Sequence, residues 1–143
     1  MATDRQAEVT WTGGLLDGAG RIDSVGSGAF GPLDITWASR AEEPAGRTSP
    51  EELIAAAHAA CVSMALSHGL AEAGTPPGQL KTSATVTFQP GEGITKVVLT
   101  IRGTVPGLDE EGFRAAAEDA KANCPVSQAL AGVPEIALDA SLA

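Results

Sequence analysis

The chain has 143 residues, a length that fits one domain, and 43% of them are apolar, which supplies a hydrophobic core and excludes wholesale disorder. Its formal net charge is -9 without any run of lysine or arginine, so nucleic acid is not an expected partner, because phosphate binding needs clustered cations. Aromatic residues are few, and a core of mostly Ala, Val, Leu and Ile needs close backbone approach or a second subunit to bury enough area.

The sequence shows no targeting signal. No amino-terminal stretch has the charge-then-apolar pattern of a signal peptide, and no apolar run approaches a membrane span, so we expect a cytoplasmic protein with no membrane contact. In that compartment two cysteines are more often catalytic or redox-active than permanently bridged. With no tandem repeat and no long linker, we expect a single domain over residues 1–143.

Three segments of alternating apolar and polar residues come first along the chain, at residues 8–11, 21–25 and 33–37. Alternation with a period of two predicts strands that bury one face. Glycines between these segments supply the turns that connect them.

An alanine-rich stretch follows and has a well-marked start. Ser49 is the predicted N-cap, Pro50 the first helical residue, and Glu52 the third-position acid of a capping box. The helix is expected to end at about Ala73, with Gly74 as its stop.

The remainder predicts a hairpin, two helices and a last strand. Alternation at 83–88 and 97–101 flanks a Pro-Gly-Glu-Gly turn, and Asp109 is placed to cap a helix that runs to about Lys121. A short helix over 125–131 and a strand over 136–142 complete the order βββ-α-ββ-α-α-β. Because hairpins and meanders dominate this order, we expect an α+β fold with antiparallel sheets.

The two cysteines occupy different settings. Cys124 sits at an N-cap before a proline, where free N–H groups and the helix dipole favour a thiolate, so on local grounds it is the more acidic thiol. Cys61 lies in mid-helix among alanines, where burial raises the pKa of a thiol. A reactive Cys61 therefore needs a cation from elsewhere, and the sequence alone does not choose among the arginines. The candidates are Arg40, Arg47 and Arg21.

Two histidines share the helix with Cys61. His58 lies one turn before Cys61 on the same face, where it can act as a base, a hydrogen-bond partner or a structural residue, and His68 lies two turns after it. Together with the cysteines they have no standard zinc spacing, so we expect no metal. A purely structural role for Cys61, as a small buried apolar residue, stays open at this point.

Two stretches resemble a known family. TSPEELIAAAHAAC at 48–61, followed by SMAL at 63–66, is similar to the first cysteine motif of the osmotically induced protein C (OsmC) and organic hydroperoxide resistance family. ANCPVS at 122–127 resembles the second motif, and the cysteine spacing and element order also fit. The resemblance covers essentially the whole chain and implies an OsmC-like fold, with sheets around a central alanine-rich helix.

The resemblance also implies an activity, a thiol-dependent peroxidase that prefers organic hydroperoxides. Cys61 takes the peroxidatic role and becomes a sulfenic acid, and Cys124 takes the resolving role and condenses with it to a disulfide. A dithiol reductant, of the lipoyl type in this family, then reduces the disulfide. No metal, flavin or haem is implied.

An arginine and an acid complete the implied site. The organic hydroperoxide resistance branch carries its arginine just after a Gly-Gly pair, but here Gly13-Gly14 is followed by Leu15. The osmotically induced branch supplies the arginine later, where Arg40 falls in the loop before the helix, and Glu51 matches the acid that holds it.

The position of Glu51 predicts a homodimer. Glu51 and Cys61 are ten residues apart, which is about 15 Å along a helix axis. An antiparallel copy of the helix closes that distance, so we expect an intertwined homodimer in which Cys61 of one chain meets Glu51, and in one version Arg40, of the other. Two alternatives on the same fold are a redox sensor with little turnover and a structural stress protein with inert cysteines.

Overall fold

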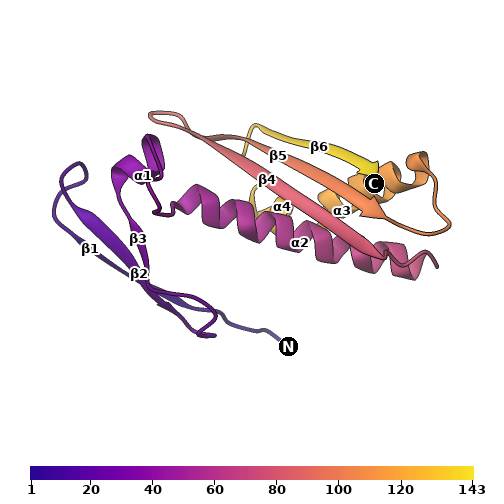
Figure 1. Cartoon of the computed structure of the whole chain (residues 1–143), viewed down its shortest axis with the longest axis horizontal. Helices are drawn as coiled ribbons and strands as arrows, with labels where there is room; N and C mark the ends of the chain where they lie inside the picture. The colour runs from indigo at the N-terminus through magenta and orange to yellow at the C-terminus, as the bar shows by residue number, and fades with distance from the viewer. The chain divides into compact units, whose positions relative to one another are not determined.

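The computed structural model describes all residues, 1–143, and the chain divides into two compact units, 1–50 and 51–143 (Figure 1). The predicted element order is confirmed with one addition, a short helix before the long alanine-rich one.

The first unit is a small antiparallel sheet followed by a helical turn. Strands β1 (Ala7–Thr12), β2 (Ala19–Val25) and β3 (Leu33–Ile35) pair in the order β1-β2-β3. The expectation that each strand buries one face is wrong for β1, which is exposed along its whole length, with Val9 at 56% and Trp11 at 39% exposure. The unit's only helix is too short to form a second layer over this sheet.

That helix, α1 (Trp37–Ala41), corrects two sequence predictions. Trp37 was expected to continue the strand and Arg40 to lie in a loop, yet both are helical. The cause is a capping box: the Ser39 N–H donates to Thr36 Oγ1 at 3.0 Å, and the Thr36 N–H donates to Ser39 Oγ at 2.9 Å.

The second unit combines one long helix, a three-stranded sheet and two further helices. Helix α2 (Pro50–Glu72) begins at the predicted proline, and strands β4 (Gln79–Gln89) and β5 (Gly93–Thr104) form the predicted hairpin. Helix α3 (Glu110–Asn123) has the predicted Asp109 cap, with the Gly112 N–H donating to its carboxylate at 2.8 Å. Helix α4 (Pro125–Ala129) and strand β6 (Glu135–Leu142) complete the unit.

One strand pairing differs from the expected antiparallel arrangement. The sheet order is β4-β5-β6, and β6 runs parallel to β5 (Figure 1). The connection from β5 to β6 passes through α3 and α4, a crossover that returns the chain to the end of the sheet where β5 began. The α+β class is confirmed.

The core lies in this second unit, where side chains from α2, β5 and α3 meet. Fully buried residues include Leu66 of α2, Leu99 and Ile101 of β5, and Phe113 of α3. Alternate residues of β5 are buried, as a strand covered by helices on one face requires. These contacts fix α2 and α3 against the same sheet and thereby set the positions of the two cysteines.

Helix α2 also corrects the expectation that no apolar run approaches a membrane span. By length and composition alone it is long and apolar enough to cross a membrane. The core helix of a soluble protein meets the same criterion, and α2 contributes core residues and buries the polar side chains of Glu51 and His58.

A pair of thiols at a helix junction

Cys124 lies where α3 ends and α4 begins. It is the C-cap of α3, donating its N–H to the Ala120 carbonyl at 2.9 Å, and the N-cap of α4, accepting from the Gln128 N–H at 3.0 Å. Its backbone is extended, with φ -61° and ψ 124°, because the following Pro125 disfavours helical geometry in the residue before it. The Asn-Cys-Pro sequence therefore holds the sulfur at a fixed break between two helices.

The structure brings Cys61 and Cys124 together. Both are free thiols, and their side chains are neighbours between α2 and the α3–α4 junction, where Cys61 packs against the core cluster that contains Cys124. Cys61 is half-buried, whereas Cys124 is fully buried in the core. A small molecule in solution therefore meets Cys61 first.

The two thiols differ in acidity. Burial raises the pKa of Cys61, and its interaction with Cys124 raises it further. Burial also raises the pKa of Cys124, but hydrogen bonding from Cys61 and from the hydroxyl and N–H groups of the following turn outweighs burial, so the net pKa is lowered. The Cys124 sulfur accepts no capping hydrogen bond from the first turn of α4, so the N–H groups of that turn stabilise its negative charge from a longer distance. Both directions are those predicted from the sequence.

A buried histidine and serine stand beside the thiol pair. His58 Nε2 lies 2.7 Å from Ser127 Oγ, with His58 wholly buried and Ser127 8% exposed. Burial lowers the pKa of His58, which favours the neutral imidazole. Ser127 was missed by the sequence analysis, although its position three residues after Cys124, one turn along α4, is a signal that could have found it.

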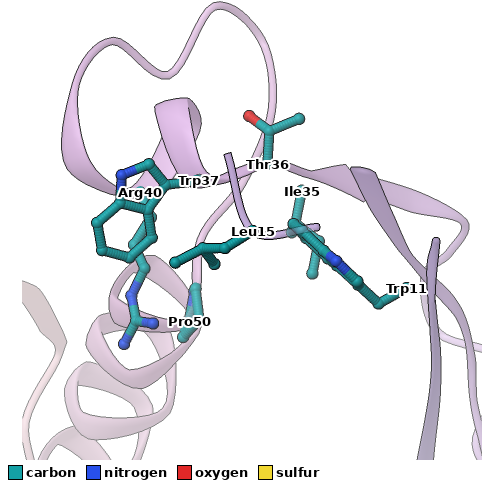
Figure 2. A pocket seen from close by; sticks show the side chains of 7 residues that line it. All are labelled: Trp11, Leu15, Ile35, Thr36, Trp37, Arg40 and Pro50. Carbon is teal, nitrogen blue, oxygen red and sulfur yellow. The ribbon is translucent and has the colours of Figure 1, made fainter. Parts of the chain in front are cut away.

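Arg40 lines a pocket of the first unit. The pocket has a volume of about 370 Å³, and Figure 2 shows its lining side chains, with Arg40 beside Trp37 at one side and Trp11 at the other. Apart from Arg40 and Thr36 the lining is apolar, formed by Trp11, Leu15, Ile35, Trp37 and Pro50.

Gly20 leaves space for two of the side chains that line this pocket. It pairs with Trp11 on one side and Ile35 on the other. A Cβ at Gly20 would lie 2.5 Å from the Trp11 ring and 2.9 Å from Ile35 Cγ1, so only glycine lets both side chains lie over this point of the sheet.

Glu51, Arg21 and Arg47 are the remaining candidate residues from the sequence. Glu51 is 6% exposed in the first turn of α2, about 15 Å along that helix from Cys61. Arg21 pairs with Asp34 at 3.5 Å on the sheet of the first unit, and Arg47 is exposed. No group of three or more His, Cys, Asp or Glu side chains is arranged to hold a metal ion.

Two free thiols in contact, one half-exposed and one buried with a lowered pKa, define a thiol-based redox protein on an α+β fold. The model of the OsmC-like protein family matches residues 43–139. Peroxiredoxin OsmC of Escherichia coli is 41% identical over 145 residues, covering 99% of each chain.

Solved structures agree with that match. An organic hydroperoxide resistance protein OsmC from Legionella pneumophila has a TM-score of 0.70 at 25% identity, with 95% of this chain and 96% of that one covered. An organic hydroperoxide resistance protein from Elizabethkingia anophelis has a TM-score of 0.71 at 25% identity over 100% of both chains. The chain belongs to the OsmC-like family, has its fold, and is an enzyme with peroxiredoxin-like peroxidase activity.

Proposed function

We propose that the chain reduces organic hydroperoxides to alcohols through a Cys61 sulfenic acid and a Cys61–Cys124 disulfide. The observation that carries this proposal is the contact between the two thiols, one half-exposed and one buried behind it. A sulfenic acid formed on Cys61 then has a second thiol within reach, with no need for a large rearrangement.

The reaction balances in three steps. The Cys61 thiolate attacks one peroxide oxygen, the O–O bond breaks, and the alkoxide leaves as an alcohol after taking up a proton. Cys124 then attacks the sulfenic sulfur, the S–O bond breaks, an S–S bond forms, and water leaves with the thiol proton. A dithiol reductant, of the lipoyl type in the proposal, supplies two electrons and two protons that restore both thiols.

Formation of the first thiolate requires a cation, because burial raises the pKa of Cys61. We assign that role to Arg40, held by Glu51. Since Glu51 is about 15 Å along α2 from Cys61, the proposal is an intertwined homodimer whose sites combine Cys61 of one chain with Glu51 and Arg40 of the other. The apolar pocket beside Arg40 suits the alkyl group of a hydroperoxide, and we place the protein in the cytoplasm.

Intact mass after one equivalent of cumene hydroperoxide tests the proposal. Wild-type protein is expected to lose two hydrogens as a disulfide, Cys124→Ser to gain one oxygen at Cys61, and Cys61→Ser to do neither quickly. Oxygen that appears first on Cys124 would reverse the assignment of the two roles. Oxidation of the wild type once, without sustained turnover when a dithiol is added, would favour a redox sensor instead.

A further inference from the structure

His58 and Ser127 form a buried polar pair that the proposed reaction does not yet use. Their side chains approach to 2.7 Å, from α2 and α4 respectively, and both are buried. His58 Nδ1 is buried without a hydrogen-bond partner. A buried polar atom left unpaired costs stability, so this arrangement needs an explanation beyond packing.

The unpaired nitrogen decides the direction of the hydrogen bond. If the Ser127 hydroxyl donated to Nε2, the imidazole proton would sit on Nδ1 as a buried donor with no acceptor. If Nε2–H donates to Ser127 Oγ instead, the imidazole N–H has an acceptor, and only the lone pair on Nδ1 lacks a hydrogen-bond donor. Unsatisfied acceptors are tolerated better than unsatisfied donors, which favours the second arrangement.

The second arrangement frees the Ser127 hydroxyl proton. That hydroxyl is one turn along α4 from Cys124 and is among the groups that stabilise the negative charge on its sulfur. With Nε2–H bonded to its oxygen, the hydroxyl can keep its proton directed at Cys124. His58, Ser127, Cys124 and Cys61 then form a row of neighbouring side chains, which begins in the interior with the His58–Ser127 hydrogen bond and ends at the half-exposed thiol.

We propose that His58 and Ser127 are positioning residues for the resolving step: His58 fixes the Ser127 hydroxyl as a hydrogen-bond donor to Cys124. This inference rests on the proposed function, because it assumes that Cys124 attacks a sulfenic acid on Cys61. In that step the Ser127 hydroxyl stabilises the attacking thiolate and is not consumed. The thiol proton still leaves with the hydroxide as water.

The test separates the two chemical steps. Protein is mixed with one equivalent of cumene hydroperoxide and quenched at intervals with a dione that traps sulfenic acid, and intact mass gives the rates of sulfenic acid and disulfide formation. A hydrogen bond to an ionised group corresponds to about a tenfold to hundredfold effect, so Ser127→Ala should slow disulfide formation by that factor and leave sulfenic acid formation unchanged.

Conservative variants distinguish positioning from packing. Ser127→Thr keeps the hydroxyl and should restore disulfide formation to near the wild-type rate. His58→Phe, which keeps the ring but loses the N–H, should be slow, and His58→Gln, which keeps a donor, should be faster than His58→Phe. Ser63→Ala is the matched control, because it removes a hydroxyl on α2 that bonds Thr82 Oγ1 at 2.7 Å.

Each outcome decides between the two proposals. Wild-type protein that forms no disulfide contradicts the proposed function. Wild-type protein that forms the disulfide, together with a Ser127→Ala variant that forms it equally fast, contradicts only the role of His58 and Ser127. Equal slowing in Ser127→Ala and Ser127→Thr, or slowing of both steps alike, also overturns it. Thermal melting shows whether each variant folds. If the Ser127 variants do not fold, the comparison of His58→Phe with His58→Gln decides, and if the His58 variants do not fold, the Ser127 variants decide.

Discussion

At the scale of single residues, the acidity of Cys61 is the quantity on which the proposed peroxidase depends. Burial raises its pKa, and an opposite charge nearby lowers the pKa of a thiol by about one to three units. If Arg40 supplies that charge, Arg40→Met should lower the rate of sulfenic acid formation at pH 7 by about tenfold to a thousandfold. The rate should recover as the pH is raised, because hydroxide then generates the thiolate that the guanidinium no longer favours.

A matched control for that variant is Arg21→Met, which removes a guanidinium of the same unit that pairs with Asp34 on the sheet. It should react with hydroperoxide at the wild-type rate. Equal losses in both variants would indicate a general effect of charge or stability and would remove Arg40 from the proposed site.

His58 predicts how stability depends on pH. Its pKa is lowered below the ordinary value of 6.5 by burial, so the unfolded chain takes up this proton first as the pH falls. The free energy of unfolding should therefore decrease below pH 6.5, by at most about 1.4 kcal/mol per pH unit from this group. Urea unfolding at pH 7.5 and pH 5 measures this change, and the free energy of unfolding should differ less between the two pH values in His58→Gln than in the wild type. The same substitution at the exposed His68 is the control, and equal flattening in both would contradict the assignment.

At the scale of secondary-structure elements, β5 and α3 meet through a glycine. Gly103 of β5 faces the Phe113 ring, and a Cβ there would lie 2.5 Å from Cζ and 2.6 Å from Cε1. Phe113 is wholly buried, so its ring can shift only by displacing other core side chains. Gly103→Ala should therefore lower the free energy of unfolding by about 1–3 kcal/mol, measured by urea denaturation.

The control for Gly103→Ala is a glycine within a helix. Gly69 of α2 has no atom within 4 Å of an added Cβ, and its backbone is helical. Gly69→Ala should raise the stability by about 1 kcal/mol, because alanine is the better helix former. A Gly103→Ala protein as stable as Gly69→Ala would show that the sheet and α3 separate more easily than the structure indicates.

The elements that the sequence predicted well are those fixed by neighbouring residues. Pro50 is the first residue of α2, as its fixed φ favours, and Asp109 caps α3 through the Gly112 N–H three residues later, so both signals are visible in the sequence. The prediction that Trp37 continues the strand was wrong, because the Thr36–Ser39 capping box starts a helix there and outweighs the alternation of the preceding strand. The parallel pairing of β6 and the Ser127–His58 contact join residues far apart in sequence, so local patterns carry no information about them.

At the scale of the whole molecule, the chain has two compact units, and we predict that they unfold as one domain. Both tryptophans, Trp11 and Trp37, lie in the first unit, so tryptophan fluorescence reports on it alone. The long helix α2 dominates the far-ultraviolet circular dichroism and belongs to the second unit. The two signals should change at the same urea concentration. Separate midpoints would contradict the single-domain prediction.

Mixing two inactive variants distinguishes a site shared between two chains of the proposed dimer from a site formed within one chain. Cys61→Ser and Glu51→Gln homodimers should each be almost inactive, because each lacks one residue at both sites. A heterodimer of the two variants has one site that lacks both residues and one that is intact. Random mixing, by unfolding the two proteins together and refolding them, should therefore restore about a quarter of wild-type peroxidase activity, as two-fold symmetry requires. If Cys61 and Glu51 act within the same chain, every site in the mixture lacks one residue and no activity returns.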